Sequence, residues 1–176
     1  MTQPDGRAHK TRTTFRMECG VAIPIRATPE KIWAAITDPE WNARYGYPGT
    51  NEYELKPGGK FQALMPAEMV ESMGVPAVGC DGEIIESDPP HRLVQSFRFL
   101  FAPEQEAEGA REVTWELVSE DDGITRLTVT HDVTDAPIAA AMIEGSAKLT
   151  EGGGGWNWIL SGLKTVLETG DAISNF

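Results

Sequence analysis

The sequence predicts an α+β fold in which a curved antiparallel sheet of about seven strands wraps around a long C-terminal helix, with two short helices directly after the first strand. Apolar residues recur at every second position in the first strand and in several later segments, which is typical of half-buried strands. Two helix-start signals follow the first strand, and near residue 155 the apolar period changes from 2 to 3.6. Short connections between the strands favour antiparallel pairing.

The first strand is expected over residues 15–23, and its apolar face carries Phe15, Met17, Cys19, Val21 and Ile23. Thr28 and Pro29 are a helix cap and a first-turn proline, so they predict a helix that ends near Thr37. Asp38, again followed by proline, repeats the signal for a second, short helix.

From residue 51 onward the pattern predicts a run of strands. A hairpin is expected around the turn at 56–59, and further strands are expected at 83–87, 93–101, 113–117 and 127–133. The acidic stretch 104–122 is interpreted as a solvated hairpin. Met65, Met69 and Met73 recur at helical spacing, which favours either a small packing helix or a lid over the mouth of a cavity.

The C-terminal helix is expected to follow the glycine run 152–155 and to stop near Gly170. Its apolar stripe consists of Trp156, Ile159, Leu160, Leu163, Val166 and Leu167. Only this long amphipathic element is available to cover the apolar faces of the strands. The glycines lack the Lys-Ser or Lys-Thr pair of a phosphate loop, so we interpret them as a flexible hinge.

The 176 residues amount to one ordinary domain, which we expect at 14–170 between a mobile tail at 1–13 and a C-terminal tail at 171–176. A net charge of −12 argues against nucleic acid or an anionic membrane as a partner. The sequence shows no signal-peptide pattern and no bilayer-spanning apolar stretch, so a cytoplasmic location is expected. Cys19 and Cys80 lack zinc-site or disulfide-framework spacing and are expected to be reduced, buried thiols, and we predict no metal and no cofactor.

A set of local motifs occurs in a specific order between residues 15 and 168. It consists of Ala27–Trp33 with Ile36–Pro39, Pro57–Phe61, Gly82–Ile84, Asp88–Pro90 with Arg92–Leu93, Val113–Trp115, Thr125–His131 and Gly155–Trp156. Together these motifs resemble the branch named after the activator of the 90-kDa heat shock protein ATPase. This branch lies within the helix-grip (SRPBCC) superfamily of START domains, the birch-pollen-allergen fold and bacterial polyketide cyclases. The resemblance implies a helix-grip fold with a cavity, in a superfamily whose members bind lipids, hormones and polyketides and sometimes catalyse cyclisation or hydrolysis.

The candidate ligand-binding residues lie at inward strand positions and on the helix stripe. They are Phe61, Gln95, Phe97, Phe99, Trp115, His131, Trp156 and Leu160. The aromatic members either fill the core or form walls for a flat apolar ligand. His131 is either a hydrogen-bonded core histidine or a group that orients a ligand or acts as an acid or base. Gln95 could pair with His131 or with a ligand carbonyl, and Glu86 could join them.

The predicted function is the binding of a small, mostly apolar molecule in an internal cavity between sheet and C-terminal helix, and catalysis is the less favoured interpretation. One alternative is a cyclase- or hydratase-like enzyme with His131 as acid or base, which requires Gln95 or Glu86 within hydrogen-bond distance. The other is a protein-interaction, co-chaperone-like module. It is motivated by the name of the family that the chain resembles and by Trp158. This residue lies away from the helical stripe and either marks a partner or homodimer surface or packs beside the strand ends.

Overall fold

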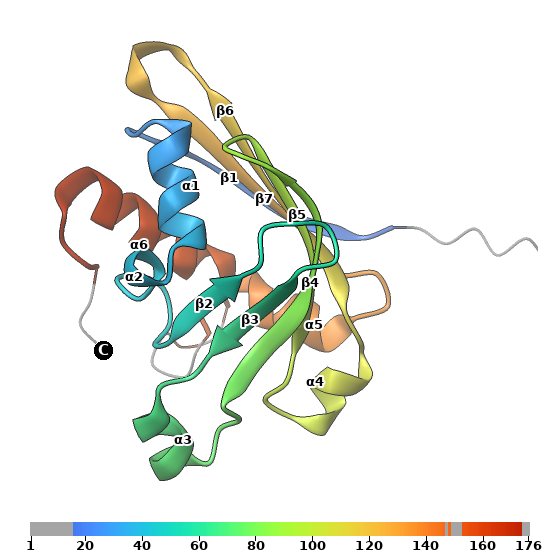
Figure 1. Cartoon of the computed structure of the whole chain (residues 1–176). Helices are drawn as coiled ribbons and strands as arrows, with labels where there is room; N and C mark the ends of the chain where they lie inside the picture. Colours follow the sequence, from blue (N-terminus) through green and yellow to red (C-terminus); the bar gives the residue numbers. More distant parts are fainter. Residues whose placement is uncertain (1–15, 147, 149–152, 174–176) are drawn as a thin grey trace, which may run out of the picture.

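Within the described residues, 16–146, 148 and 153–173, the computed structural model contains one sheet of seven strands in the order β1-β7-β6-β5-β4-β3-β2 (Figure 1). The strands are β1 (Glu18–Ile25), β2 (Thr50–Tyr53), β3 (Lys60–Leu64), β4 (Val78–Asp88), β5 (Arg92–Phe99), β6 (Arg111–Ser119) and β7 (Thr125–Asp132). All neighbouring strands are antiparallel. The predicted fold class is therefore confirmed, and the tail predicted at 1–13 lies outside the described residues.

The helices of the described part are α1 (Pro29–Thr37), α2 (Pro39–Asn42), α3 (Ala67–Met73), α4 (Pro103–Ala107), α5 (Pro137–Glu144) and α6 (Gly155–Thr169). Both predicted N-caps are present. The Thr28 hydroxyl accepts a hydrogen bond from the Lys31 N–H at 3.3 Å, and the Asp38 carboxylate accepts one from the Glu40 N–H at 2.9 Å. Among these helices, none has the length and apolar character needed to cross a bilayer.

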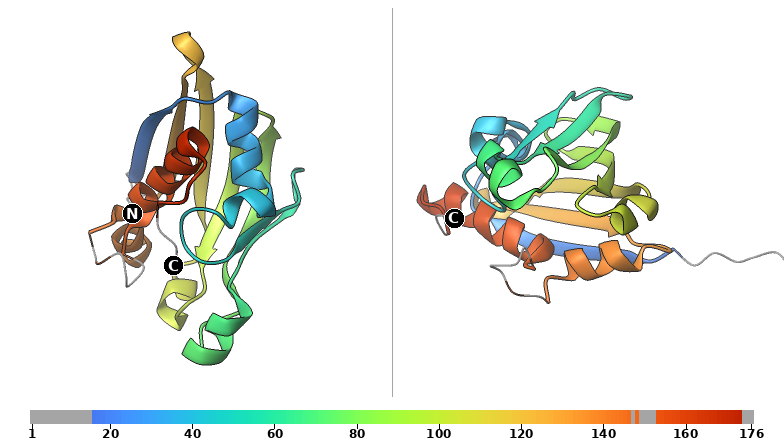
Figure 2. Two further views of the ribbon diagram at one scale, coloured as in Figure 1. Left: turned by 90° about the vertical axis from the view of Figure 1, so that its left-hand side faces the viewer. Right: turned by 90° about the horizontal axis from the view of Figure 1, so that it is seen from below.

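The core lies between the concave face of the sheet and the helices α1 and α6, which sit on the same side of it (Figures 1 and 2). Inward-facing residues alternate along each strand, as in β7, where Thr125, Leu127, Val129 and His131 are all buried. The stripe of α6 packs onto them with its apolar side chains, and Leu160 and Leu163 are almost completely buried. The C-terminal helix thus covers the sheet as the 3.6-residue period predicts.

Glycines at the start of α6 are closely packed: the described residues 153–155 are buried, while the flexible hinge expected for this run stays a prediction. The hydroxyl of Tyr47 accepts hydrogen bonds from the N–H groups of Gly154 and Gly155, both at 2.9 Å. Gly155 has φ +55°, and a Cβ there would lie 2.2 Å from the carbonyl oxygen of Ile143. Glycine is needed at this position because the chain approaches the end of α5 too closely for any side chain.

The far end of α6 is held by charged side chains. Arg44 donates to the carbonyl of Gly170 at 2.9 Å, and Lys164 donates to the carbonyl of Pro24 at 2.7 Å. The Glu168 carboxylate accepts the backbone N–H of Arg26 at 2.8 Å. Both ends of the helix are therefore tied to the first fifty residues of the chain.

Two helices, α4 and α5, differ from the sequence-based expectation, and a third, α3, is the small helix that the methionine spacing favoured. The acidic stretch 104–122 is not a hairpin throughout, because its first residues belong to α4, and α5 follows β7 where no element was expected. The methionine segment forms the short helix α3, on which Met73 is 67% exposed. Short helices of five to eight residues carry too little periodicity to be separated from turns by pattern alone.

Trp158 is not an exposed partner surface. Its side chain is half-buried, and its indole N–H donates to the carbonyl of Gly46 at 2.9 Å. The residue packs beside the loop that follows α2, whereas the alternative interpretation expected it beside the strand ends. One of the two observations that motivated an interaction module, an exposed Trp158, is therefore missing.

We predict that Trp156→Ala lowers the free energy of unfolding by about 3–5 kcal/mol, because this 5%-exposed side chain fills the core at the start of α6. Trp158→Ala is expected to cost about 1–2 kcal/mol, since it removes one hydrogen bond and a half-buried ring. Urea titration of both variants measures the difference. Equal and small losses would mean that α6 does not close the core.

Candidate functional site

Six of the candidate rings form one continuous network on the concave face. Phe97 of β5 lies at its centre, with ring centroids 5.5 Å from both Phe61 and His131. Trp156 of α6 covers the network from above, 6.0 Å from His131 and 5.1 Å from Trp115. We call this the aromatic cluster: Tyr53, Phe61, Phe97, Phe99, Trp115, His131 and Trp156. Sequence reasoning missed Tyr53, whose strand was recognised but not its 4.9 Å contact with Phe61.

A row of directly paired residues crosses the sheet through this cluster. Gln95 of β5 pairs with Val113 of β6, Val113 pairs with His131 of β7, and His131 pairs with Cys19 of β1. Paired residues project from the same face, and Cβ atoms of adjacent partners lie about 5 Å apart. The row therefore places Gln95 and His131 on one face, about 10 Å apart across two strand spacings.

Buried polar atoms in this region have no partner among the described protein groups. They are Gln95 Oε1, Trp115 Nε1, Trp156 Nε1 and both ring nitrogens of His131. His131 is 0% exposed and Gln95 is 1% exposed. Leaving a buried polar group without a hydrogen bond costs about 1–3 kcal/mol, and buried polar groups in native proteins are nearly always satisfied. The arrangement suits a molecule that offers both donor and acceptor atoms.

His131 is neutral at physiological pH. Burial lowers its pKa to about 4, and the charge of Arg111 adds to this, while the negative charge of Asp132 opposes it. A neutral imidazole donates from one nitrogen and accepts at the other. Together with the two indole N–H groups and the Gln95 carbonyl, it provides an uncharged hydrogen-bonding surface.

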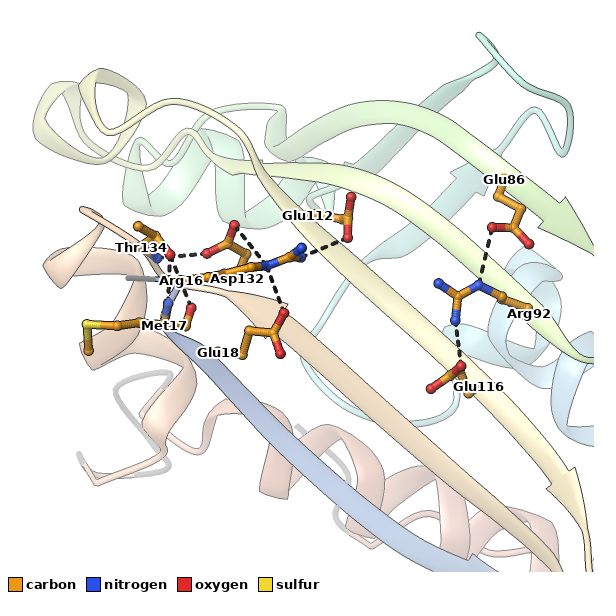
Figure 3. A network of polar contacts seen from close by, with 9 residues as sticks. All are labelled: Arg16, Met17, Glu18, Glu86, Arg92, Glu112, Glu116, Asp132 and Thr134. Atoms are coloured by element: carbon orange, nitrogen blue, oxygen red, sulfur yellow. Dashed lines mark hydrogen bonds and ion pairs between the residues drawn. The ribbon is translucent and has the colours of Figure 1, made fainter. Parts of the chain in front are cut away.

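Glu86 does not join this surface. A β-bulge between Ile84 and Glu86 shifts the register of β4, and both Ile85 and Glu86 are exposed. The Glu86 carboxylate instead faces Arg92 on the opposite side of the sheet, with 3.2 Å between Oε2 and Nε (Figure 3). The consecutive apolar residues Ile84 and Ile85 left the orientation of Glu86 open in the sequence, and the bulge resolves it.

Gln95 does not pair with His131 either, because neither the Gln95 oxygen nor the His131 nitrogens have a protein partner. The acid-base alternative required one of these two polar groups within hydrogen-bond distance of His131. In the described structure, neither Gln95 nor Glu86 is hydrogen-bonded to His131.

Ion pairs mark the convex face, away from the cluster (Figure 3). Arg16 lies 2.7 Å from Glu18 and 2.9 Å from Glu112, and Arg92 also contacts Glu116. Such partly exposed pairs contribute little to stability. Among the described residues, no group of three or more His, Cys, Asp and Glu side chains is placed to hold a metal ion.

The family model described as "Activator of Hsp90 ATPase homolog 1-like protein" matches residues 26–168. The chain belongs to this family. No curated protein matches the sequence.

Solved structures show the same fold in related proteins. CalU16 from Micromonospora echinospora is 23% identical, with a TM-score of 0.60 over 88% of this chain and 78% of that chain. MLL2253 from Mesorhizobium loti is 22% identical, with a TM-score of 0.62 over 88% of this chain and 99% of that chain. PFC0360w, an HSP90 activator from Plasmodium falciparum, is 25% identical, with a TM-score of 0.52 over 89% and 91% of the two chains.

We predict that His131 makes the protein less stable in mild acid. Its pKa is about 4 in the folded chain against 6.5 unfolded, so the unfolded chain binds more protons between these values and stability falls as the pH falls through them. From pH 7.5 to 5.0 this amounts to about 2 kcal/mol. Urea titration should show that the free energy of unfolding of His131→Leu falls by about 2 kcal/mol less than that of wild type over this range. The control is His91→Gln, at an exposed turn position, whose free energy of unfolding should fall by as much as that of wild type. Identical pH dependence in wild type and His131→Leu would contradict a neutral, buried imidazole.

The two free thiols are expected to differ in reactivity. Cys80 is buried, and burial together with the Asp81 charge raises its pKa to about 12, whereas Cys19 is only half-buried. In the native protein, Ellman's reagent should therefore modify one thiol quickly, and the second only after unfolding. Cys19→Ser should abolish the fast phase and Cys80→Ser should keep it. The reverse pattern would contradict this placement.

Proposed function

We propose that the protein binds a small, mostly apolar molecule between the sheet and α6, at the aromatic cluster around His131. The observation that carries the proposal is the set of buried polar atoms without protein partners inside an otherwise apolar region. A core that served packing alone would be more stable with apolar side chains of the same shape at these positions.

The chemistry of the cluster supports a ligand with aromatic or aliphatic surface and few polar atoms. Ring faces and edges of Phe97, Phe99 and Trp156 offer stacking contacts around His131. Trp115 and Trp156 each have one indole N–H to donate, and Gln95 has a carbonyl to accept. Ligand sites of this kind, apolar with a few convergent polar groups, are the common type for small molecules in proteins.

Family membership supports the same function at a coarser level. The resemblance to the helix-grip superfamily implies a fold that accommodates ligands between sheet and C-terminal helix, and this chain has that fold. The interaction alternative rested on the family resemblance and on an exposed Trp158, and because that side chain is engaged with Gly46, only the family resemblance still supports it. Ligand binding is therefore the function that the described residues favour.

Native mass spectrometry of the protein as purified tests the proposal. We expect an added mass of a small organic molecule that is lost on denaturation. For protein that carries none, a panel of neutral aromatic alcohols and ketones should change tryptophan fluorescence, because Trp115 and Trp156 line the site. No bound mass and no response to any compound in the panel would refute the proposal.

A variant pair separates binding from folding. His131→Leu removes two unpartnered nitrogens at similar volume, so we expect unchanged or higher stability at pH 7.5 and at least tenfold weaker binding. Ser87→Ala is the matched control, because it also removes a buried unpartnered atom, on β4, outside the cluster. Equal affinity of wild type and His131→Leu for every ligand would place the site elsewhere.

A further inference from the structure

A groove of about 560 Å³ opens between the start of β1, the end of β7 and the helix α5. Figure 2 shows α5 beside β1 at this edge of the sheet. The groove is lined by Met17, Cys19, Val133, Asp135, Ala136, Pro137, Ala140, Ala141 and Glu144. Its volume falls within the roughly 300–1,000 Å³ of typical small-molecule sites, and most of its walls are apolar.

The groove exists because α5 turns short side chains toward β1. Pro137, Ala140, Ala141 and Glu144 follow the spacing i, i+3, i+4, i+7 and so share one face of the helix. The side chains of Ala139 and Ile143 are buried on another face. Alanine at the two central positions leaves unfilled the space that longer side chains would occupy.

The inner end of the groove meets His131. Cys19 is the strand partner of His131 on β1, and Val133 follows His131 by two residues on the same side of the chain. Both neighbours line the groove, so His131 lies directly behind its inner wall, although its own side chain is not part of the lining. His131 is fully buried, and neither of its nitrogens has a protein partner. An apolar groove thus lies next to an unsatisfied, uncharged donor and acceptor, separated from it by the side chains of Cys19 and Val133.

The charges around the groove disfavour an anionic ligand. Asp135 and Glu144 stand at the rim and are exposed. The nearby Arg111 guanidinium donates to the carbonyls of Ala110, Thr134 and Asp135 and is thereby engaged with the backbone. Burying a carboxylate beside a neutral imidazole without a cationic partner costs several kcal/mol.

We propose that the groove between β1 and α5 holds the apolar body of an uncharged amphiphile, whose hydroxyl or carbonyl end hydrogen-bonds to His131. This inference rests on the proposed function and extends its site from the aromatic cluster to the edge of the sheet. A hydroxyl satisfies either ring nitrogen, and a carbonyl satisfies the protonated one. The apolar body contacts Val133, Ala140 and Ala141.

Isothermal titration calorimetry with three probes of equal chain length tests the charge selection. We expect 1-octanol to bind at least tenfold more tightly than octanoate and octylammonium at pH 7.5, and to shift the NMR signals of the His131 ring. Equal or tighter binding of octanoate or octylammonium would overturn the uncharged class. Absence of 1-octanol binding up to its solubility would overturn the groove as the site of an amphiphile.

Two phenylalanine variants of α5 test the location. Ala141→Phe places a ring in the groove and should weaken 1-octanol binding at least tenfold. Ile138→Phe is the matched control, because Ile138 is 36% exposed on the same helix and does not line the groove, and its binding should equal that of wild type. Circular dichroism checks that both variants fold, and Ala140→Leu replaces Ala141→Phe if the latter does not.

The outcomes for this inference and for the proposed function are distinct. Suppose that a co-purified molecule or a neutral aromatic probe binds Ala141→Phe and wild type with the same affinity. The groove inference then fails, while binding at the aromatic cluster stands. If no molecule co-purifies and neither the aromatic panel nor 1-octanol binds, both fail.

Discussion

The seating of α6 on the concave face of the sheet is the constraint on which the remaining structure depends. Every central strand turns an apolar face to the same side, and α6 is the long amphipathic helix that covers it. The loop after α2 holds this helix through Tyr47 at its start and Arg44 beyond its end. The helix starts on closely packed glycines, so the backbone at its start lies directly against the end of α5. This contact fixes the start of the helix, and Trp156 points into the core.

This arrangement encloses polar groups that weaken the core. His131, Gln95 and the two indoles would each be replaced by apolar side chains if stability were the only requirement, since an unsatisfied buried polar atom costs about 1–3 kcal/mol. Proteins commonly retain such costs at binding sites, where the missing partner is supplied by a ligand. The neutral state of His131 follows from the same burial, so one physical cause determines both the cost of its unsatisfied ring nitrogens and the absence of charge on the ring.

Local pattern predicted most of the fold and only part of the site. Alternation and capping identified the strands and α1, because they depend on neighbours within a few residues. The bulge that turns Glu86 outward, the glycines packed against Ile143, and the partner of Trp158 all depend on contacts made after folding. The ring positions could be placed on the inward face from sequence, whereas their ring contacts and the absence of a Gln95–His131 bond follow from sheet register.

Pairing of the first and last strands explains why the groove escapes sequence analysis altogether. Cys19 and His131 come from opposite ends of the domain and become neighbours only when β1 joins β7. In the sequence, the alanines of α5 indicate only a good helix former. They become walls of a groove because the β1–β7 pairing places β1 beside them. The groove is therefore a property of the tertiary structure: the edge strand β1 supplies one wall, and the short helix α5 after β7 supplies the other. Any shift in the β1–β7 register by one residue would turn both Cys19 and the groove wall to the opposite face, so the register that builds the core also builds the groove.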